Sequence, residues 1–511
     1  MKALSGTPPK ATERDCRTRK QSSPRKAVQY TGCAERRIEK VETRDGGSIM
    51  SDNAIINILK IREDNTPLEL VQEEREGEFS FADANRSSSW ITASENLAIK
   101  KSDLRKGIEP WLTSLFQSEH LSLLTGTGLS TAIKVMATGP ANTAMSVPTL
   151  DTDYSDEINA SAQAIAYKNE RGEANIEDYI RVINELLRGL EILGYSRSDD
   201  KGKKASYDRL DDSFKKIISE FADSISSIEN SIAIADEEKR HEAFDYLVNF
   251  LMSFASRTGT RERLNIFTTN YDRLIEAGSE LAGLHLLDRF VGTLAPIFRS
   301  SRLDIDMHYN PPGIRGEPRY LEGVARFTKL HGSIDWINTG TDIRRIGLPF
   351  GSKDILSFLN APGIDGVDVR KIMIYPNAAK DRETTEYPYV ELFRDFAAAL
   401  CRPNSTLVTY GYGFGDDHIN RIIRDMLTIP STHLVIISYD EVSGRIMKKY
   451  KEFGRPSQIS LIIGNGVADL KTLVDYFLPK PSIDRASIRM SELLKQRYST
   501  PKSDDGGEVR P

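Results

Sequence analysis

Short apolar runs alternate with longer amphipathic stretches over most of residues 118–480. Each run is short enough for a buried strand and ends in glycine or polar residues, and the stretches between them carry apolar residues at helical spacing. Strands that alternate with helices in this way predict an α/β fold with a doubly wound parallel sheet. The strand-like runs are 121–124, 264–267, 326–336, 371–375, 405–410, 433–440 and 458–463.

This alternation is interrupted at about residues 157–258, where the apolar spacing is helical throughout. One stripe runs from Ile176 to Ile192, and a later stripe contains Phe221 and Ile225. Apolar stripes have to be buried against other elements, so we predict a large helical insertion into the α/β domain. We expect its stripes to serve core packing and to carry no chemistry.

The two ends of the chain differ from its centre. Residues 1–49 hold twelve Lys or Arg against six Asp or Glu, with almost no apolar periodicity, which predicts a disordered basic tail. A nucleic-acid-binding arm and a mis-assigned start, with Met50 as the true first residue, are the alternatives. Residues 50–117 are expected to pack on the core, and residues 481–511 to form a polar C-terminal tail.

Composition narrows the class of protein further. The 511 residues are 39% hydrophobic and 28% charged, which is typical of a soluble globular protein, and the net charge of -5 gives no general attraction to nucleic acid or membrane. No apolar run is long enough for a transmembrane helix, and no signal peptide is recognised. Cys16, Cys33 and Cys401 form no C-x-x-C pair, which excludes a cysteine zinc site and fits a reducing cytoplasm.

Polar clusters follow the strand-like runs at the points where the strands are expected to end. In a parallel sheet these ends share one rim, and ligands of open α/β sheets bind there. We therefore expect the clusters to converge on one site. They are 126–130, 268–272, 331–333, 411–417, 438–440 and 464–469.

The first cluster, Gly126-x-Gly128-x-Ser130, directly follows the run 121–124. Glycines at such a turn let backbone N–H groups approach a phosphate. The dinucleotide fingerprint also needs a third glycine and an acidic residue about 20 positions on, and the cluster lacks this complete pattern. On its own, the cluster is compatible with a phosphate-binding loop and with an ordinary strand-to-helix turn.

Taken in order, the clusters resemble the motifs of the sirtuins. They read GTGLS at 126–130, TTNYD at 268–272, KLHGS at 329–333, YGYGFGDD at 410–417 and GNGVADL at 464–470. The resemblance covers roughly residues 118–475 and is strongest to the bacterial sirtuin-like domains of antiviral defence proteins. It implies a Rossmann-like NAD-binding domain over residues 118–480, interrupted by the helical insertion.

Sirtuins cleave the bond between nicotinamide and ribose in NAD+, so the resemblance implies roles for individual residues. Asn270 would hold the ribose hydroxyls or the attacking water, Asp272 would help to recognise the carboxamide, and His331 would act as a base. Histidine titrates near neutral pH, which suits that role. The implied NAD-binding residues are Gly126, Thr127, Gly128 and Ser130 at the pyrophosphate; Thr269 beside Asn270; Gly411, Tyr412, Gly413 and Ser438 at the phosphate or adenosine ribose; and Gly466 and Val467 at the adenine.

Each of these assignments has a structural alternative. Asn270 precedes a predicted helix and can cap it, and His331 can be a hydrogen-bonded residue at the end of a strand. His418 is expected to be an unremarkable surface residue of the helix that follows the fourth cluster. Capping or packing alone is the alternative for Asp416, Asp417, Tyr412 and Phe414.

The chain departs from classical sirtuins in two places. Their first glycine loop leads into a proline-containing segment that ends in Asp-Phe-Arg, whereas this chain has STAIKVMATG at 130–139. They also carry a four-cysteine zinc module, and no cysteine lies here between Cys33 and Cys401. The parts that form an acyl-lysine channel are therefore missing or rewritten, and we expect no zinc or other metal.

With no peptide channel, water is the natural acceptor, so we predict hydrolysis of NAD+ to ADP-ribose and nicotinamide. NAD+ is then a substrate, and the chain would be a cytoplasmic effector of anti-phage defence that depletes it. The resemblance also implies a homo-oligomer and a partner, a HerA-type hexameric ATPase, because this chain has no G-x-x-x-x-G-K-[ST] loop of its own. Neither membrane association nor direct nucleic-acid binding by this chain alone is expected.

Three other functions remain open at this stage. The first is a nucleotide-sensing subunit that binds ADP-ribose or NAD+ and regulates a partner ATPase or nuclease complex without turnover. A nuclease subunit is less favoured because no carboxylate cluster has convincing metal-site spacing. Protein deacylation comes last, because the zinc module is absent.

Overall fold

The computed structural model describes residues 56–480, apart from 62–63, 74, 76, 84–87, 92–97, 141–147, 169–171, 257–261, 302–304, 310–318, 361–362, 365–371 and 373–386. The tails predicted at 1–49 and 481–511, and nearly all of the strand predicted at 371–375, lie outside these residues. The residues described all belong to one compact unit, Asn53–Pro511.

A large sheet organises this unit. Among the described residues, eleven strands pair in the order β4-β3-β2-β1-β17-β16-β15-β5-β6-β12-β7. The strands from β17 to β7 are mutually parallel. The mostly parallel α/β fold is therefore confirmed. The parallel strands are β5 (His120–Thr125), β6 (Leu264–Thr268), β7 (His285–Leu287), β12 (Val324–Lys329), β15 (Ser405–Tyr410), β16 (His433–Ser438) and β17 (Ile459–Ile463).

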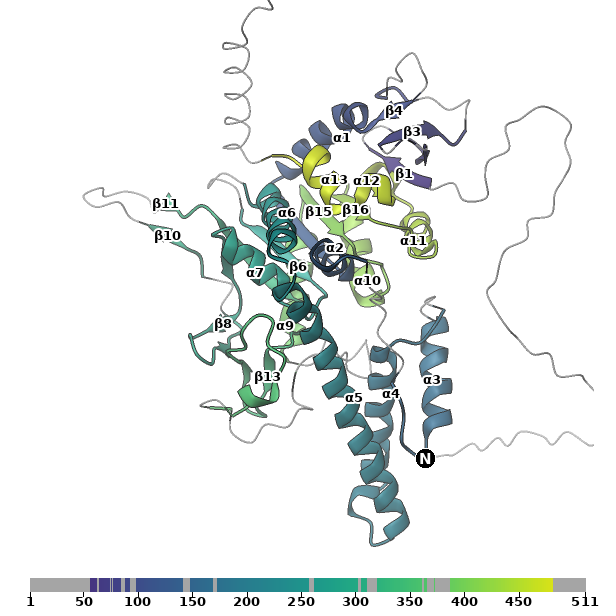
Figure 1. Ribbon diagram of the computed structural model, residues 1–511, viewed down its shortest axis with the longest axis vertical. Helices are drawn as coiled ribbons and strands as arrows, with labels where there is room; N and C mark the ends of the chain where they lie inside the picture. The colour runs from purple at the N-terminus through teal and green to yellow at the C-terminus, as the bar shows by residue number, and fades with distance from the viewer. Residues whose placement is uncertain are drawn as a thin grey trace, which may run out of the picture. The chain divides into compact units, whose positions relative to one another are not determined.

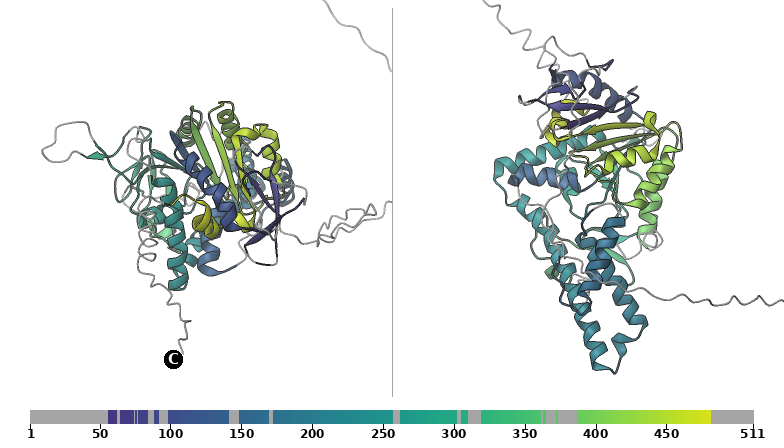
Figure 2. Two further views of the ribbon diagram at one scale, coloured as in Figure 1. Left: turned by 90° about the horizontal axis from the view of Figure 1, so that it is seen from above. Right: turned by 90° about the vertical axis from the view of Figure 1, so that its right-hand side faces the viewer.

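Helices cover both faces of this sheet because successive strand residues point to opposite sides. On β5, Leu121 and Leu123 belong to one apolar core, and Leu124 belongs to the other. Figure 2 shows the strands between these helical layers. The first layer contains α1 (Lys101–Phe116), α2 (Thr127–Thr138), α6 (Glu237–Ala255), α7 (Leu274–Leu281) and α13 (Leu470–Thr472), and the second contains α9 (Tyr389–Leu400), α10 (Asp417–Leu427) and α11 (Arg445–Phe453).

The N-terminal segment extends the sheet as well as packing on it. β1 (Ile56–Lys60) pairs antiparallel with β17, and β2 (Leu68–Gln72), β3 (Glu78–Phe81) and β4 (Ile99–Lys100) continue the antiparallel order. These last strands lie in a polar, acidic stretch, so hydrophobicity gave no indication of them. Their half-exposed position at the sheet edge accounts for that composition.

The helical stretch predicted at 157–258 divides into two parts. The final helix, α6, joins the layer of α2 and α7 on the sheet. The other helices are α3 (Ser155–Lys168), α4 (Ile176–Ile192) and α5 (Lys201–Ala233), and they extend away from the sheet (Figure 1). Their apolar faces form a third core with residues that follow β12, such as Ile334 and Leu348.

Smaller elements complete the described chain. β8 (Phe290–Val291), β9 (Ile297–Phe298), β13 (Trp336–Asn338) and β14 (Ile343–Arg345) form a small antiparallel sheet, and β10 (His308–Tyr309) pairs with β11 (Arg319–Tyr320). A short helix, α12 (Asn465–Ala468), follows β17. In the part of the chain that the structure describes, no helix combines the length and apolar character needed to cross a bilayer.

Candidate functional site

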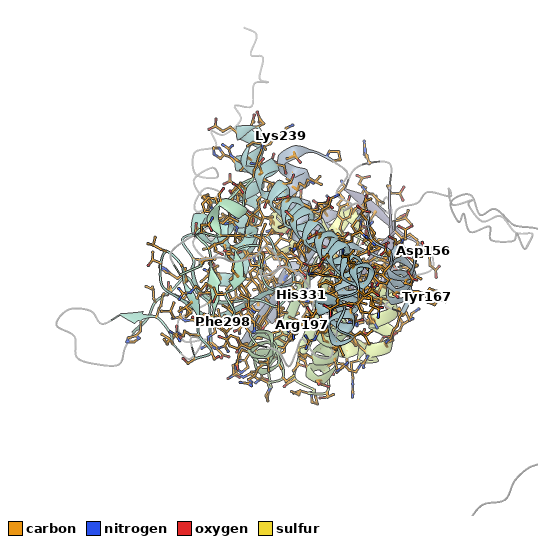
Figure 3. All side chains as sticks on the ribbon, turned by 90° about the horizontal axis from the view of Figure 1, so that it is seen from below. Asp156, Tyr167, Arg197, Lys239, Phe298 and His331 are labelled. Atoms are coloured by element: carbon orange, nitrogen blue, oxygen red, sulfur yellow. The ribbon has the colours of Figure 1, made fainter. Side chains whose placement is uncertain are left out.

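The loops that follow four neighbouring strands, β15, β5, β6 and β12, line one cleft of about 330 Å³. This volume lies within the roughly 300–1,000 Å³ typical of small-molecule sites. Figure 3 looks along the projecting helices and shows His331 among the central side chains, with Asp156 and Tyr167 of α3 near the periphery. The predicted site residues that line the cleft are Gly126, Thr127, Ser130, Thr269, Asn270, Asp272, His331, Tyr412 and Gly413.

A buried hydrogen-bond network joins the loops that follow β5 and β6. The Asn270 amide nitrogen donates to the Gly126 carbonyl oxygen at 2.9 Å and to the Ser130 hydroxyl at 2.8 Å. Ser130 in turn donates to Asp272 Oδ2 at 2.5 Å, and Asp272 Oδ1 accepts from the Leu274 backbone N–H at 3.1 Å. Asn270 therefore does not cap α7; its amide ties the two loops together.

The network leaves one atom of Asn270 without a partner. The side-chain oxygen Oδ1 is buried and accepts no hydrogen bond from the described residues. The imidazole Nε2 of His331 is also buried and unpaired within the described part of the chain. Both side chains line the cleft. Because buried polar atoms normally have partners, these two atoms mark places where a ligand can bind.

The glycines of the loops after β5 and β15 pack against each other through their backbones. A Cβ atom at Gly126 would lie 2.5 Å from the Gly411 oxygen, and one at Gly128 would lie 2.6 Å from the Gly411 Cα. The Gly126 N–H donates to the Tyr410 oxygen, and the Gly128 N–H donates to the Gly411 oxygen, both at 3.1 Å. These glycines are required for loop packing, and their N–H groups are engaged within the protein.

The helix that follows the loop after β5 begins within the glycine motif itself. α2 starts at Thr127, with Gly126 at its N-cap position. Thr127, Thr131 and Lys134 recur at helical spacing and all line the cleft. The positive end of the α2 dipole, a hydroxyl residue and an ammonium group therefore lie on the same side of the cleft.

His418 is not a surface residue as predicted. Its side chain is only 6% exposed, and its ring centre lies 5.6 Å from that of His331 and 4.8 Å from that of Phe393. The polar start of α10 suggested a surface helix, but the first turn of this helix packs beneath the loop that carries His331. Asp416 stands at the N-cap position of α10 and also lines the cleft.

Lys329 supports the loop that follows β6. Its side chain is 1% exposed, and its ammonium group donates to the backbone oxygens of Asp272 and Tyr271 and to Glu276 Oε1. The lysine of the KLHGS motif therefore positions the TNYD loop, while its neighbour His331 faces the cleft. Sequence reasoning singled out His331 and missed this supporting role.

A buried ion pair connects the same loop to the helical insertion. Glu229 of α5 accepts from the Arg273 backbone N–H at 2.8 Å and from the Arg273 guanidinium at 2.5 and 3.2 Å. Their side chains are 1% and 10% exposed. Burial opposes the charge of Arg273, but the hydrogen bond and charge of Glu229 raise the pKa of its guanidinium overall. Helix α5 is thus fixed directly to the residue that follows Asp272.

Some predicted NAD-binding residues lie away from the cleft lining. Gly466 donates its N–H to Asn57 Oδ1 at 2.9 Å, and a Cβ atom there would lie 2.8 Å from the Phe79 ring. Strands β1 and β3 therefore pack directly over the turn predicted to contact adenine. The predicted residues that do not line this cleft are Gly128, Gly411, Ser438, Gly466 and Val467.

The cleft also contains residues that sequence reasoning missed. Arg445, the first residue of α11, lies beside the loop after β15 and donates to the Gly413 oxygen at 3.2 Å. Lys134 had a usable signal, since it lies at helical spacing from Thr127 and Thr131. Arg445 had none, because its position depends on the loop between β16 and α11. The insertion contributes Asn175, Ile176, Glu177, Phe221, Ile225 and Ile228.

These insertion residues correct the expectation that the helical stripes carry only core packing. Phe221 and Ile225 belong to the predicted stripe of α5, and Ile176 begins the predicted stripe of α4. All three are buried in the third apolar core and at the same time border the cleft. Within the described residues, no group of three metal-binding side chains is found.

The comparisons with known proteins agree with this geometry. Residues 264–454 match the family model described as a SIR2-like domain. The match runs from β6 to the end of α11 and includes Asn270, Asp272, His331 and Arg445. No curated protein matches the chain. The loops after β6, β12 and β15, together with Arg445, therefore belong to a SIR2-like domain at residues 264–454, whereas the loop after β5, α2 and the insertion line the cleft from outside the matched stretch.

Proposed function

We propose that this protein hydrolyses NAD+ to ADP-ribose and nicotinamide. The observation that carries the proposal is the pair of buried, unpaired atoms, Asn270 Oδ1 and His331 Nε2, on one cleft of a SIR2-like domain. Asn270 Oδ1 accepts hydrogen bonds, and His331 Nε2 accepts one when the neutral ring carries its proton on Nδ1, so the two atoms suit the hydroxyl groups of a ribose. Such domains are associated with NAD-related activity, and the cleft residues support a specific reaction.

The charges along the cleft suit an oxidised dinucleotide. Lys134, Arg445 and the start of α2 offer positive charge for a pyrophosphate, beside Thr127. Asp272 offers a carboxylate on the loop that also carries Asn270. NAD+ has this same polarity, with an anionic pyrophosphate and a cationic nicotinamide ring.

The reaction breaks the bond between the ribose C1 and the nicotinamide nitrogen. The electron pair of that bond goes to the nicotinamide ring, which leaves as a neutral molecule, and C1 acquires oxocarbenium character. His331, as the base, would accept a proton from a ribose hydroxyl and so stabilise the developing positive charge. Asn270 would hold the ribose in position by accepting a hydrogen bond from a hydroxyl group.

Water as the acceptor is supported by the insertion. The side chains of Phe221, Ile225 and Ile228 give the cleft an apolar border. A lysine side chain of a protein substrate would need an open channel to the ribose, and no zinc module is expected to form one. A small acceptor such as water has no such requirement.

We further propose that hydrolysis serves anti-phage defence by depletion of NAD+, that the protein acts as a cytoplasmic homo-oligomer, and that a HerA-type hexameric ATPase is its partner. This part of the proposal depends on the sequence resemblance to defence proteins. Uncontrolled hydrolysis would be toxic, so the activity has to be gated. The buried ion pair between Glu229 and Arg273 connects the insertion directly to the loop that carries Asn270 and Asp272, so the insertion is in a position to control that loop.

The experiment is to incubate the full-length protein with NAD+, alone and with the product of the neighbouring gene, and to measure nicotinamide together with binding of NAD+ and ADP-ribose. Release of nicotinamide that depends on His331 supports hydrolysis. Tight nucleotide binding without turnover in either preparation would contradict it and favour a sensing subunit.

A further inference from the structure

The helical insertion contributes a carboxylate to the cleft. Glu177 lies in the first turn of α4 and lines the cleft together with Asn175, Ile176 and Tyr271. The Tyr271 hydroxyl donates to Glu177 Oε1 at 3.1 Å. Among the described residues, no hydrogen bond to the second oxygen, Oε2, occurs. Glu177 therefore borders the cleft as a carboxylate with acceptor capacity to spare.

Tyr271 connects this carboxylate to the residues of the proposed reaction. It stands in the chain between Asn270 and Asp272, and its ring centre lies 6.3 Å from that of His331. On its other side the ring packs edge-on against Phe221 of α5, at 5.5 Å. Glu177 thus enters the cleft lining from the side of the insertion, bonded to the tyrosine whose ring lies beside that of His331.

The start of α4 is held rigidly, which fixes the position of Glu177. The Asn175 side chain accepts from the Asp178 backbone N–H, and the Asp178 side chain accepts from the Asn175 backbone N–H, both at 3.1 Å. This reciprocal capping box satisfies two N–H groups at the end of the helix. Ile176 and Tyr179 are buried on either side. A pre-organised carboxylate costs little reorganisation when a reaction needs it.

The proposed function assigns the unpaired atoms Asn270 Oδ1 and His331 Nε2 to the ribose hydroxyls, and the polar groups beside them are already engaged. Asp272 accepts hydrogen bonds at both carboxylate oxygens, from Ser130 and from the Leu274 backbone. The Asn270 amide nitrogen is occupied by Gly126 and Ser130. These groups are arranged to hold the ribose end of a ligand and one another, and they are poorly placed to activate a water molecule.

We propose that Glu177 holds the attacking water and accepts its proton. The inference rests on the proposed NAD+ hydrolysis and names the residue that makes water the acceptor. In the step, the water oxygen forms a bond to the ribose C1, the bond from C1 to the nicotinamide nitrogen is broken, and the proton of the water passes to the Glu177 carboxylate. The insertion, and not the SIR2-like domain, supplies this group.

The test is Glu177→Gln in the full-length protein, assayed with NAD+ in the presence and absence of 3-acetylpyridine. General-base catalysis is worth about 10²–10⁴-fold, so kcat for hydrolysis should fall at least about 100-fold, with KM changed less than about threefold. Exchange of nicotinamide for 3-acetylpyridine should persist, because this nucleophile has no proton to lose.

Two further variants separate this role from a structural one. Tyr271→Phe removes the hydrogen bond to Glu177 and should lower hydrolysis by about tenfold, again with exchange retained. Glu185→Gln is the matched control, since Glu185 lies on the same helix, is 51% exposed and pairs with Arg181 at 3.7 Å. It should behave as wild type.

The outcomes are distinguishable. A wild-type protein that releases no nicotinamide, alone or with its partner, would overturn both the proposed function and this inference. Hydrolysis at the wild-type rate in Glu177→Gln would overturn the inference alone. An equal loss of hydrolysis and exchange in Glu177→Gln would also overturn it, because the residue would then act in bond cleavage or in folding.

Discussion

The two sides of the cleft are built differently. One side, which we call the rim wall, consists of the loops after β5, β6, β12 and β15, and Asn270, Ser130 and Asp272 join the first two of these loops. The other, the insertion wall, consists of α4 and α5 and is mostly apolar apart from Asn175 and Glu177. The rim wall carries the polar groups that the proposed function assigns to a nucleotide, and the insertion wall gives the cleft an apolar border.

This difference separates two properties of the protein. The residues proposed to bind the nucleotide belong to strand-end motifs, whose position follows from the parallel sheet. The apolar residues of the insertion wall belong to helices whose position cannot be predicted from a sequence motif. We infer that the reaction class resides in the rim wall and that the choice of acceptor resides in the insertion wall.

The largest expected effect comes from breaking the rim wall at His331. His331→Ala should reduce nicotinamide release by about 1,000-fold or more, because it removes a general base of the proposed reaction. Nicotinamide can be quantified by liquid chromatography, with thermal unfolding as a check on the fold. His285→Ala, at an exposed position on β7, is the control and should leave the rate unchanged. Equal rates in the two variants would contradict the role of His331.

The next effect tests the link between the walls. Glu229→Gln should lower the free energy of unfolding by about 3 kcal/mol, because it leaves the Arg273 guanidinium buried without its charge partner. Chemical denaturation measures this change. Glu220→Gln on the same helix, with a 49% exposed side chain, should cost less than about 1 kcal/mol. Similar losses in both variants would show that the buried pair does not couple α5 to the site loop.

A third effect concerns the opposite end of the sheet, where His433 lies at the start of β16. Burial, and then the charge of Lys60, lower the pKa of His433 to about 4 from its ordinary value of 6.5. The unfolded chain therefore binds a proton below pH 6.5 that the folded protein does not. Stability should be fully present above pH 6.5 and fall by about 3 kcal/mol as the pH approaches 4.

His433→Gln should flatten this pH dependence, as measured by urea denaturation between pH 4 and 7. His433 packs on Trp111 and bonds to Ser460, so the variant also loses some stability at neutral pH. The diagnostic quantity is the slope of stability against pH. An unchanged slope would assign acid sensitivity to other groups.

The smallest effect is expected at the phosphate side of the rim wall. Lys134→Ala and Arg445→Ala should each raise KM for NAD+ by about tenfold with kcat nearly unchanged, since a charge-assisted hydrogen bond is worth about 1.5–3 kcal/mol. Steady-state kinetics at two salt concentrations measures this. Lys168→Ala, at an exposed position at the end of α3 and outside the cleft lining, is the control. A fall in kcat with constant KM would place these cations at the reacting bond instead.

Much of the rim wall could be predicted from the sequence because its determinants are local. The apolar runs before Gly126, Asn270 and Tyr412 were long enough to predict strands, and the parallel topology brought their ends together. The glycines were misleading in one respect, because Gly126 and Gly128 are required for contact with Gly411 and not for free N–H groups.

The insertion wall could not be predicted, because the same apolar residues pack a core and border the cleft. The spacing of Phe221 and Ile225 predicted that one face of their helix is buried, but it could not predict that this face borders the cleft. His418 was misjudged for a related reason, since burial beneath the His331 loop depends on tertiary contacts. Strands β2 and β3 could not be predicted, because a polar sheet edge has little hydrophobic pattern. Their packing over Gly466 could therefore not be predicted either.

The most direct test of the central claim is a proton NMR time course of NAD+ with the full-length protein and its neighbouring gene product. We predict that nicotinamide and ADP-ribose appear in equal amounts with wild type and that neither appears with His331→Ala. Persistence of intact NAD+ with wild type, or equal cleavage by His331→Ala, would contradict the assignment of this cleft as the site of NAD+ hydrolysis.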